Sequence, residues 1–240
     1  MHMLARTIIT DKMKIKNLLK TCLVGAASAA IITSCETERP IYYSAYMTAV
    51  ETTGGEPYSC LFVSDDSITI IPLNQYEFIS KLETDDRIIG TFTIPDGEIS
   101  DPVEVEFTSF TQLPPQDITV TGNIDTVGNN YIDPQTMWHS GGVKGASRFL
   151  TISFAIQASS AGIQHDIYLV DDTSLSNPDA DGYYRLKFRH DANNDPFVEV
   201  VGGVATFRLP EKYTAPGIKG IKVDFKNFSP GVDSTLTVTF

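Results

Sequence analysis

Hydrophobic and polar residues alternate along most of the chain after residue 40. Leu150, Ile152, Phe154 and Ile156 are each followed by a smaller or more polar residue, and the same period of two recurs over residues 103–107, 184–189, 221–226 and 236–240. A period of two places successive side chains on opposite faces of a strand, one toward a core and one toward water, as in antiparallel sheets. Only residues 75–82 carry a pattern that fits a helical turn. The sequence therefore predicts an all-β protein.

Turn-forming residues divide the predicted strands into two groups. Clusters of glycine, proline and aspartate separate five short strands between residues 42 and 110, the number and size of strands in an OB-like barrel. Pro114 and Pro115 then interrupt the pattern, because consecutive prolines cannot lie in a central strand. About seven further strands follow, as in a β-sandwich. We predict an OB-like barrel over residues 41–113 and an antiparallel β-sandwich over residues 114–240.

The start of the chain has the pattern of an export signal. Lys14, Lys16 and Lys20 precede an apolar run that ends at residue 32, and this run is shorter than the roughly 20 residues of a transmembrane helix. Small Ser34 then precedes Cys35, whose thiol can accept a diacylglyceryl group. The segment resembles the lipobox of bacterial lipoproteins, with isoleucine at position 32 in place of the more usual leucine. The alternative is an ordinary signal peptide in which the cysteine is incidental.

A lipidated Cys35 fixes the expected processing and location. Residues 1–34 would be a removed signal peptide, whether translation starts at Met1 or at Met13, and residues 35–40 would be a short tether. Two or more acyl chains hold a protein stably on a bilayer. We therefore expect a cell-envelope protein anchored to the outer membrane, facing either the periplasm or the cell surface.

Charge and cysteine content limit the partners. The chain has 18 basic and 30 acidic residues, of which five basic and one acidic precede Cys35, so the body after Cys35 has a net charge of −16. Such a charge repels phosphates, and nucleic acid is not an expected partner. After processing, Cys60 is the one cysteine left besides Cys35, so no disulfide is expected within the body. We interpret Cys60 as a buried strand residue.

Several short segments together resemble the NigD-like lipoproteins of Gram-negative gut and oral anaerobes. They are residues 61–66 and 86–92 in the first half, and residues 165–170, 186–192 and 203–207 in the second, combined with the lipobox and the chain length. The resemblance implies an N-terminal OB-like domain followed by a C-terminal β-sandwich. It supplies no catalytic residues and no cofactor, and the family takes its name from a bacteriocin-associated operon.

A row of cations is the first candidate binding feature. Arg185, Lys187 and Arg189 share one face of a predicted strand, at intervals of about 6.7 Å. Such a row can receive an anionic glycan or an acidic loop of a partner protein. The alternative is pairing with acids across the sheet, for which Glu199 on the next predicted strand is a candidate.

Aromatic residues are the second candidate. Tyr42, Tyr46 and Tyr58 could form a platform for sugar rings on the barrel, or they could pack in a core or between the domains. Trp138 is either a contact residue on a loop or a plug against the sandwich.

Metal binding has few candidate ligands. His165 begins one predicted strand and His190 ends another, so the two imidazoles could meet and bind zinc, or each could satisfy backbone groups at a strand end. Asp179 and Asp181 have the spacing of a calcium loop, but Phe188 occupies the position of the required glutamate. We interpret that segment, and residues 191–196, as Asx-rich hairpin loops.

No nucleophile elbow, metalloprotease motif or nucleotide-binding loop is present in the sequence. We therefore expect a non-enzymatic protein without a cofactor, acting as a binding or accessory module for a protein or glycan. A glycan-binding surface lipoprotein and a bacteriocin-associated immunity or accessory protein are the alternatives, and an enzyme is the least favoured class.

Overall fold

The computed structural model describes residues 40–52, 60–74, 81–141, 148–159, 162–228 and 233–240. The predicted signal peptide, Cys35, Tyr58 and all but the end of the predicted helical turn lie outside these residues. The chain divides into two compact units, one ending at Leu113 and the other formed by Pro114–Phe240. Within the described residues, no helix is long and apolar enough to cross a membrane.

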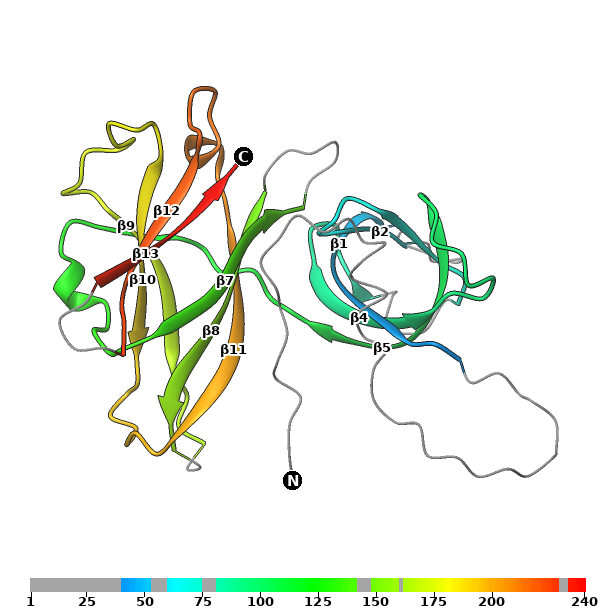
Figure 1. The fold of residues 1–240 in the computed structure, drawn as a ribbon, viewed down its shortest axis with the longest axis horizontal. Helices are drawn as coiled ribbons and strands as arrows, with labels where there is room; N and C mark the ends of the chain where they lie inside the picture. Colours follow the sequence, from blue (N-terminus) through cyan, green and yellow to red (C-terminus); the bar gives the residue numbers. More distant parts are fainter. Residues whose placement is uncertain (1–39, 53–59, 75–80, 142–147, 160–161, 229–232) are drawn as a thin grey trace. The chain divides into compact units, whose positions relative to one another are not determined.

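The first unit is a closed five-stranded barrel, as the alternating pattern predicts (Figure 1). Around the barrel the strands run in the order β1-β2-β3-β5-β4, and β3 and β5 are parallel. The strands are β1 (Tyr43–Thr52), β2 (Cys60–Ser64), β3 (Thr69–Pro72), β4 (Arg87–Thr93) and β5 (Val103–Gln112).

The barrel interior contains both apolar and charged side chains. Met47, Phe62 and Phe107 are almost fully buried in its apolar core. Arg87 is only 1% exposed and donates hydrogen bonds to both carboxylate oxygens of Asp65 and to the Thr48 hydroxyl. The buried charge is thus neutralised by a neighbour, as a charge in a low-dielectric interior requires.

Cys60 is a buried strand residue, as the sequence predicts. It begins β2 and is 3% exposed. Burial, and secondarily the nearby Asp86, raises the pKa of its thiol to about 12. The reactive thiolate is therefore disfavoured at neutral pH, which fits a packing role.

The second unit is a two-sheet sandwich, again as predicted. Eight strands are described, close to the expected seven, and they form a five-stranded sheet of order β13-β12-β10-β9-β6 and a three-stranded sheet of order β11-β8-β7 (Figure 1). The strands are β6 (Thr119–Thr121), β7 (Asp133–Ser140), β8 (Phe149–Ala158), β9 (Asp166–Asp172), β10 (Tyr184–Asp191), β11 (Glu199–Arg208), β12 (Gly220–Lys226) and β13 (Asp233–Thr239), with short 3-10 turns η2 (Ile124–Thr126) and η4 (Glu211–Tyr213).

Most neighbouring strands in the sandwich are antiparallel, but two pairs are parallel. β6 runs parallel to β9, and β10 runs parallel to β12. The second pair arises because the chain leaves the five-stranded sheet after β10, forms β11 in the other sheet, and returns as β12 beside β10. The inward residues of the two sheets, among them Leu150, Phe154, Phe188 and Phe207, fill the core between them.

Candidate functional site

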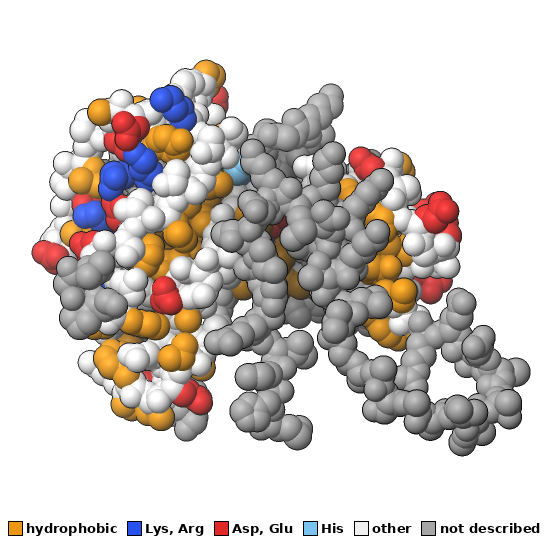
Figure 2. All heavy atoms as spheres, in the orientation of Figure 1, with side chains coloured by type: hydrophobic (Ala, Val, Ile, Leu, Met, Phe, Trp, Pro, Cys, Tyr) orange, Lys and Arg blue, Asp and Glu red, His pale blue; other side chains and the backbone are white. Residues whose placement is uncertain are grey.

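The parallel pairing of β10 and β12 creates a charged surface on the outer side of the five-stranded sheet. Leu186 and Phe188 face the core beside Val223 and Phe225, so the residues between them face outward. β13 pairs with the other edge of β12 and adds its own outward residues. We call this surface the charged face, and it comprises Arg185, Lys187, Arg189, Lys222, Asp224, Lys226, Asp233 and Thr235. Lysine, arginine and acidic side chains gather over these strands in Figure 2.

At one end of the charged face the cations are paired with acids. Arg185 lies 2.6 Å from Asp224, and Lys187 lies 2.8 Å from Asp172. The hydrogen bond from Lys187, followed by that from Ser174, lowers the pKa of Asp172 to about 2. We call this end of the surface the paired end.

The predicted calcium loop belongs to the paired end. Lys222 lies 2.8 Å from the Asp179 carboxylate and 2.9 Å from that of Asp181. The hydrogen bond from Lys222, with those from backbone N–H groups of the loop, lowers the pKa of Asp179 to about 2. The segment joins antiparallel β9 and β10, as a hairpin loop does. Among the described residues, no group of three or more His, Cys, Asp or Glu side chains is placed to hold a metal ion.

At the other end of the charged face two cations contact backbone carbonyls. Nε of Arg189 donates to the carbonyl of Val127 at 3.1 Å, and Nζ of Lys226 donates to that of Asn129 at 3.1 Å. Lys226 also lies 4.6 Å from the centre of the Tyr131 ring, a cation–π contact. No carboxylate among the described residues forms an ion pair with either cation. We call this the open end.

The loop between β6 and β7 supplies both carbonyls, and backbone hydrogen bonds and one close backbone approach hold it in place. Gly128 has a φ of +39°, and a Cβ at this position would lie 2.5 Å from the carbonyl oxygen of His190. The Asn130 N–H donates to that same oxygen at 2.9 Å, and the Ile132 N–H donates to the Lys226 carbonyl at 3.0 Å. The loop therefore binds one N–H donor of each cation. The other donors of Arg189 and Lys226 form no hydrogen bond with a described residue.

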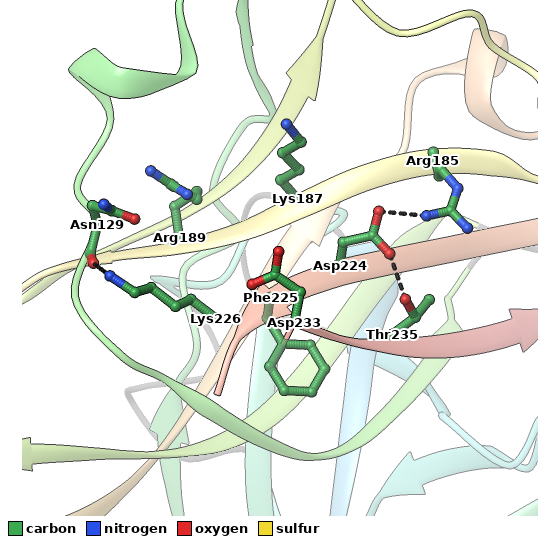
Figure 3. Close-up of a pocket in the computed structure, with 9 residues that line it drawn as sticks. All are labelled: Asn129, Arg185, Lys187, Arg189, Asp224, Phe225, Lys226, Asp233 and Thr235. Carbon is green, nitrogen blue, oxygen red and sulfur yellow. Dashed lines mark hydrogen bonds and ion pairs between the residues drawn. The ribbon is translucent and has the colours of Figure 1, made fainter. Parts of the chain in front are cut away.

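A hollow of about 500 Å³ lies on the charged face, over the open end and the middle of β10 and β12 (Figure 3). Four cations and two carboxylates contribute to its lining, so its local charge is opposite in sign to that of the whole chain. Asp233 projects into the hollow, whereas Asp224 is bonded to Arg185 and to Thr235. The lining residues are Asn129, Arg185, Lys187, Arg189, Asp224, Phe225, Lys226, Asp233 and Thr235.

The expected partner of the cation row is different from the one in the structure. Glu199 lies in β11, which pairs with β8 in the three-stranded sheet, so it cannot lie across the sheet from β10. The interpretation of residues 191–196 as a hairpin loop is also wrong, because a hairpin joins neighbouring strands of one sheet. The segment joins the two sheets, and Asn193 and Asn194 turn it with φ values of +49° and +63°.

The candidate aromatic residues lie in separate places. In the barrel unit, Tyr42 precedes β1 and is 57% exposed, whereas Tyr46 in β1 is partly buried. Burial, with Asp65 nearby, raises the pKa of Tyr46. In the sandwich, Trp138 lies within β7, opposite Thr151 of β8, so it is a strand residue and not part of a loop.

His165 and His190 meet, as their positions at the ends of two predicted strands allow, and they form part of a hydrogen-bonded chain. Nδ1 of His165 lies 2.8 Å from Nε2 of His190, and Nε2 of His165 lies 2.9 Å from the Asp195 carboxylate. Asp195 also accepts hydrogen bonds from the backbone N–H and hydroxyl of Ser159. These contacts lower the pKa of Asp195, the Ser159 hydroxyl having the largest effect.

The direction of each hydrogen bond in this chain follows from its ends. Nδ1 of His190 lies 2.8 Å from the Tyr131 carbonyl, which can only accept, so this nitrogen carries a proton. Burial lowers the pKa of His190, and in the neutral ring Nε2 accepts from His165. His165 therefore donates to His190 from Nδ1, and its Nε2 lies against the Asp195 carboxylate. Because Ser159 follows β8 and His190 lies in β10, the chain clamps the two sheets together.

Sequence reasoning finds half of the charged face. Alternation places Arg185, Lys187 and Arg189 on one surface, and the same rule applied to residues 221–226 gives Lys222, Asp224 and Lys226. Alternation alone does not show that these two strands are neighbours, because β11 separates them along the chain. Asn129 was also missed, although Gly128 and two asparagines mark a tight turn there.

Comparisons with known proteins extend the description of the fold. No curated protein matches the chain. A solved structure of a protein of unknown function from Bacteroides vulgatus is 21% identical, with a TM-score of 0.63 over 83% of this chain and 90% of that one. A candidate lipoprotein from Bacteroides fragilis is 9% identical, with a TM-score of 0.59 over 82% and 97%. A NigD-like immunity protein from Bacteroides caccae is 19% identical, with a TM-score of 0.56 over 82% and 93%.

At these identities the solved structures establish the fold alone. The family follows from a separate match. The model of the NigD-like C-terminal β-sandwich domain matches residues 115–240, which is more than half of the chain. These residues contain both sheets, the charged face and the histidine chain. The chain therefore belongs to the NigD-like family.

Proposed function

We propose that this protein is a non-enzymatic, lipid-anchored component of the cell envelope that acts by binding through the charged face of its sandwich. The observation that carries the proposal is the open end, where Arg189 and Lys226 are held by backbone carbonyls without a carboxylate partner among the described residues. At the paired end each cation forms a close ion pair with an acid, whereas at the open end Asp233, which stands opposite Lys226 in the β12–β13 register, forms no close ion pair with it. Cations that backbone carbonyls position, and that keep free N–H donors, are available to a ligand.

The anchoring part of the proposal rests on the sequence. Cys35 after Ser34 has the pattern of a lipoprotein processing site, and the short tether would hold the folded body close to the outer membrane, on its periplasmic face or at the cell surface. A site on such a protein meets polysaccharides and envelope proteins before it meets cytoplasmic metabolites. Its partner is therefore expected to be a glycan or an envelope protein, and the protein needs no cofactor to bind it.

A bacteriocin-associated immunity or accessory role is the second candidate. The name of the Bacteroides caccae structure favours it. A protein in this role would also act by binding, so the charged face would serve both candidates.

Two measurements test the proposal. An alkyne-labelled fatty acid should enter the wild-type protein and not Cys35→Ala, and equal labelling of both would contradict the anchor.

A photoreactive amino acid at exposed Thr237, which lies on β13 opposite Lys222 of β12, should crosslink to an envelope component in intact cells. The same probe at exposed Glu199, in the other sheet, is the control. Equal crosslinking from both positions, or none from Thr237, would contradict binding through the charged face.

A further inference from the structure

We infer that the hollow at the open end binds a carboxylate-bearing saccharide, such as a chain of uronic acid residues, with its carboxylate on Arg189 and Lys226. This inference rests on the proposed binding function and names its ligand class. It depends on three properties of the hollow, which are the free donors of its cations, the unused acceptor of Asp233, and the full pairing of β10 and β12 beneath it.

The cations present suitable donors for a carboxylate. Arginine has five N–H donors, and the carbonyl of Val127 takes only the one on Nε. The two terminal nitrogens of Arg189 form no hydrogen bond or ion pair with another described residue, and they form the fork that binds a carboxylate through both oxygens. Lys226 uses one of its three donors on Asn129. Because the loop already fixes both side chains, little conformational entropy is lost when they bind a ligand.

Asp233 supplies the second half of the recognition. Its carboxylate lines the hollow and forms no hydrogen bond or ion pair with another described residue. A carboxylate only accepts hydrogen bonds, so a ligand that satisfies it must bring donors close to its own negative charge. A uronic acid residue has this combination, since its ring hydroxyls donate and its carboxylate accepts. Inorganic phosphate is a poorer match, because at neutral pH it keeps only one or two hydroxyl donors and they sit on the charged group itself.

The rest of the lining excludes other ligand types. Of the nine lining residues only Phe225 is apolar, and it is itself 7% exposed, so an apolar ligand would desolvate the charges without compensation. A peptide could not pair with β10 or β12, because each of these strands already pairs on both edges. The hollow has about 500 Å³, within the range of small-molecule sites. These features favour a short hydrophilic ligand recognised by side chains.

The test is a calorimetric titration of the lipid-free protein, residues 36–240, with trigalacturonate as the probe. Maltotriose is the neutral control, and triglutamate and inorganic phosphate are the other anions. Arg189→Gln should weaken binding at least about tenfold, and Lys226→Gln about threefold to tenfold. Lys219→Gln removes the same charge just before β12, at its far end, and should leave the affinity unchanged.

The outcomes separate this inference from the proposed function. Binding of trigalacturonate that is lost in Arg189→Gln and kept in Lys219→Gln supports the inference. No binding, binding that both variants retain, or equal affinity for triglutamate or phosphate would overturn it. If trigalacturonate does not bind while the Thr237 probe still crosslinks in cells, the charged face binds a different ligand. The saccharide inference is then overturned, and the proposed function stands.

Discussion

The two ends of the charged face use the same side chains differently. At the paired end, Arg185, Lys187 and Lys222 each contact at least one aspartate within 2.9 Å. At the open end, Arg189 and Lys226 contact backbone carbonyls at 3.1 Å. Both ends lie on the same two strands, β10 and β12. The difference comes from the neighbouring segments. Aspartates of β9, of β12 and of the loop before β10 meet the cations at the paired end, whereas the loop before β7 brings carbonyls to the open end.

This difference shows that a row of cations need not have a single role. Ion pairs on a partly exposed surface stabilise a fold by up to about 1 kcal/mol each and hold the strands in register. Cations held by carbonyls keep their remaining N–H donors free, even though Asp125 and Asp233 attract Arg189 at longer range. The paired end therefore serves the sheet, and the open end is free to serve a ligand. Four changes test this division, and they follow from the largest expected effect to the smallest.

Gly128→Ala should damage the open end most. Alanine would need a positive φ, and its Cβ would lie 2.5 Å from the His190 carbonyl oxygen, so the loop must shift away from Arg189 and Lys226. We expect a loss of about 3 kcal/mol in the free energy of unfolding, measured with a chemical denaturant. Gly162→Ala also has a positive φ but meets nothing within 4 Å, and should cost only about 1 kcal/mol. Equal losses would mean that the close approach of the loop is unimportant.

Acidification should destabilise the loop through its contact with His190. Burial lowers the pKa of His190, so below pH 6.5 the unfolded chain binds a proton that the folded chain does not. Stability should then fall as the pH falls from about 7 to 5, by at most about 1.4 kcal/mol per pH unit for this proton. Asp195, whose pKa is also lowered, adds a loss below its ordinary value of 3.8.

Thermal unfolding of the wild type and His190→Gln across this pH range checks the expectation. The variant should unfold at a lower temperature at pH 7, with a weaker dependence on pH between 7 and 5. A wild-type midpoint that does not change between pH 7 and 5 would contradict the role assigned to His190.

Asp224→Asn should make the paired end resemble the open end. The change removes the carboxylate that lies 2.6 Å from Arg185 and keeps a side chain of the same shape. If a free cation is what an acidic saccharide needs, trigalacturonate should bind about twofold to fivefold more tightly, as loss of a partly exposed ion pair allows. An unchanged or weaker affinity in the same titration would show that Arg185 is no part of the binding surface.

The smallest expected effect is the difference in stability between variants of the two arginines, one at each end of the charged face. Arg185→Gln should lower the free energy of unfolding by up to about 1 kcal/mol, since it breaks the pair with Asp224. Arg189→Gln should change it by less than about 0.5 kcal/mol, because no close ion pair is lost and only the longer-range attraction to Asp125 and Asp233 is removed. Denaturant titrations of both variants give the comparison. A larger loss for Arg189→Gln would assign the open end a structural role.

The sequence predicts the fold well where local patterns determine it. Alternation identifies β5, β8, β10, β12 and β13, and turn-forming residues delimit β1 to β4. Two prolines follow Leu113, the last residue of the first compact unit. The burial of Cys60 follows from its neighbours in β2. Local patterns do not determine which strands become neighbours. Glu199 was therefore placed on the wrong sheet, and the pairing of Lys187 with Asp172 and of Arg185 with Asp224 was not foreseen.

The candidate site illustrates the same limit. Arg189 belongs to the predicted row of cations, but it differs from Arg185 and Lys187 because it contacts the backbone carbonyl of Val127. The sequence does not mark this contact, because it does not depend on the type of side chain at residue 127. The contact of His165 with His190 was considered because each lies at a strand end. Asp195 and Ser159, which complete that chain, come from a loop and from the other sheet.

The division of the charged face is tested most directly by side-chain NMR of the arginine Nε–H groups during titration with trigalacturonate. Arg185→Lys and Arg189→Lys variants assign the two signals. The account predicts that the Arg189 signal shifts in proportion to saturation while the Arg185 signal stays in place, because Arg185 remains bonded to Asp224. Shifts of equal size in both signals, or a shift confined to Arg185, would contradict it.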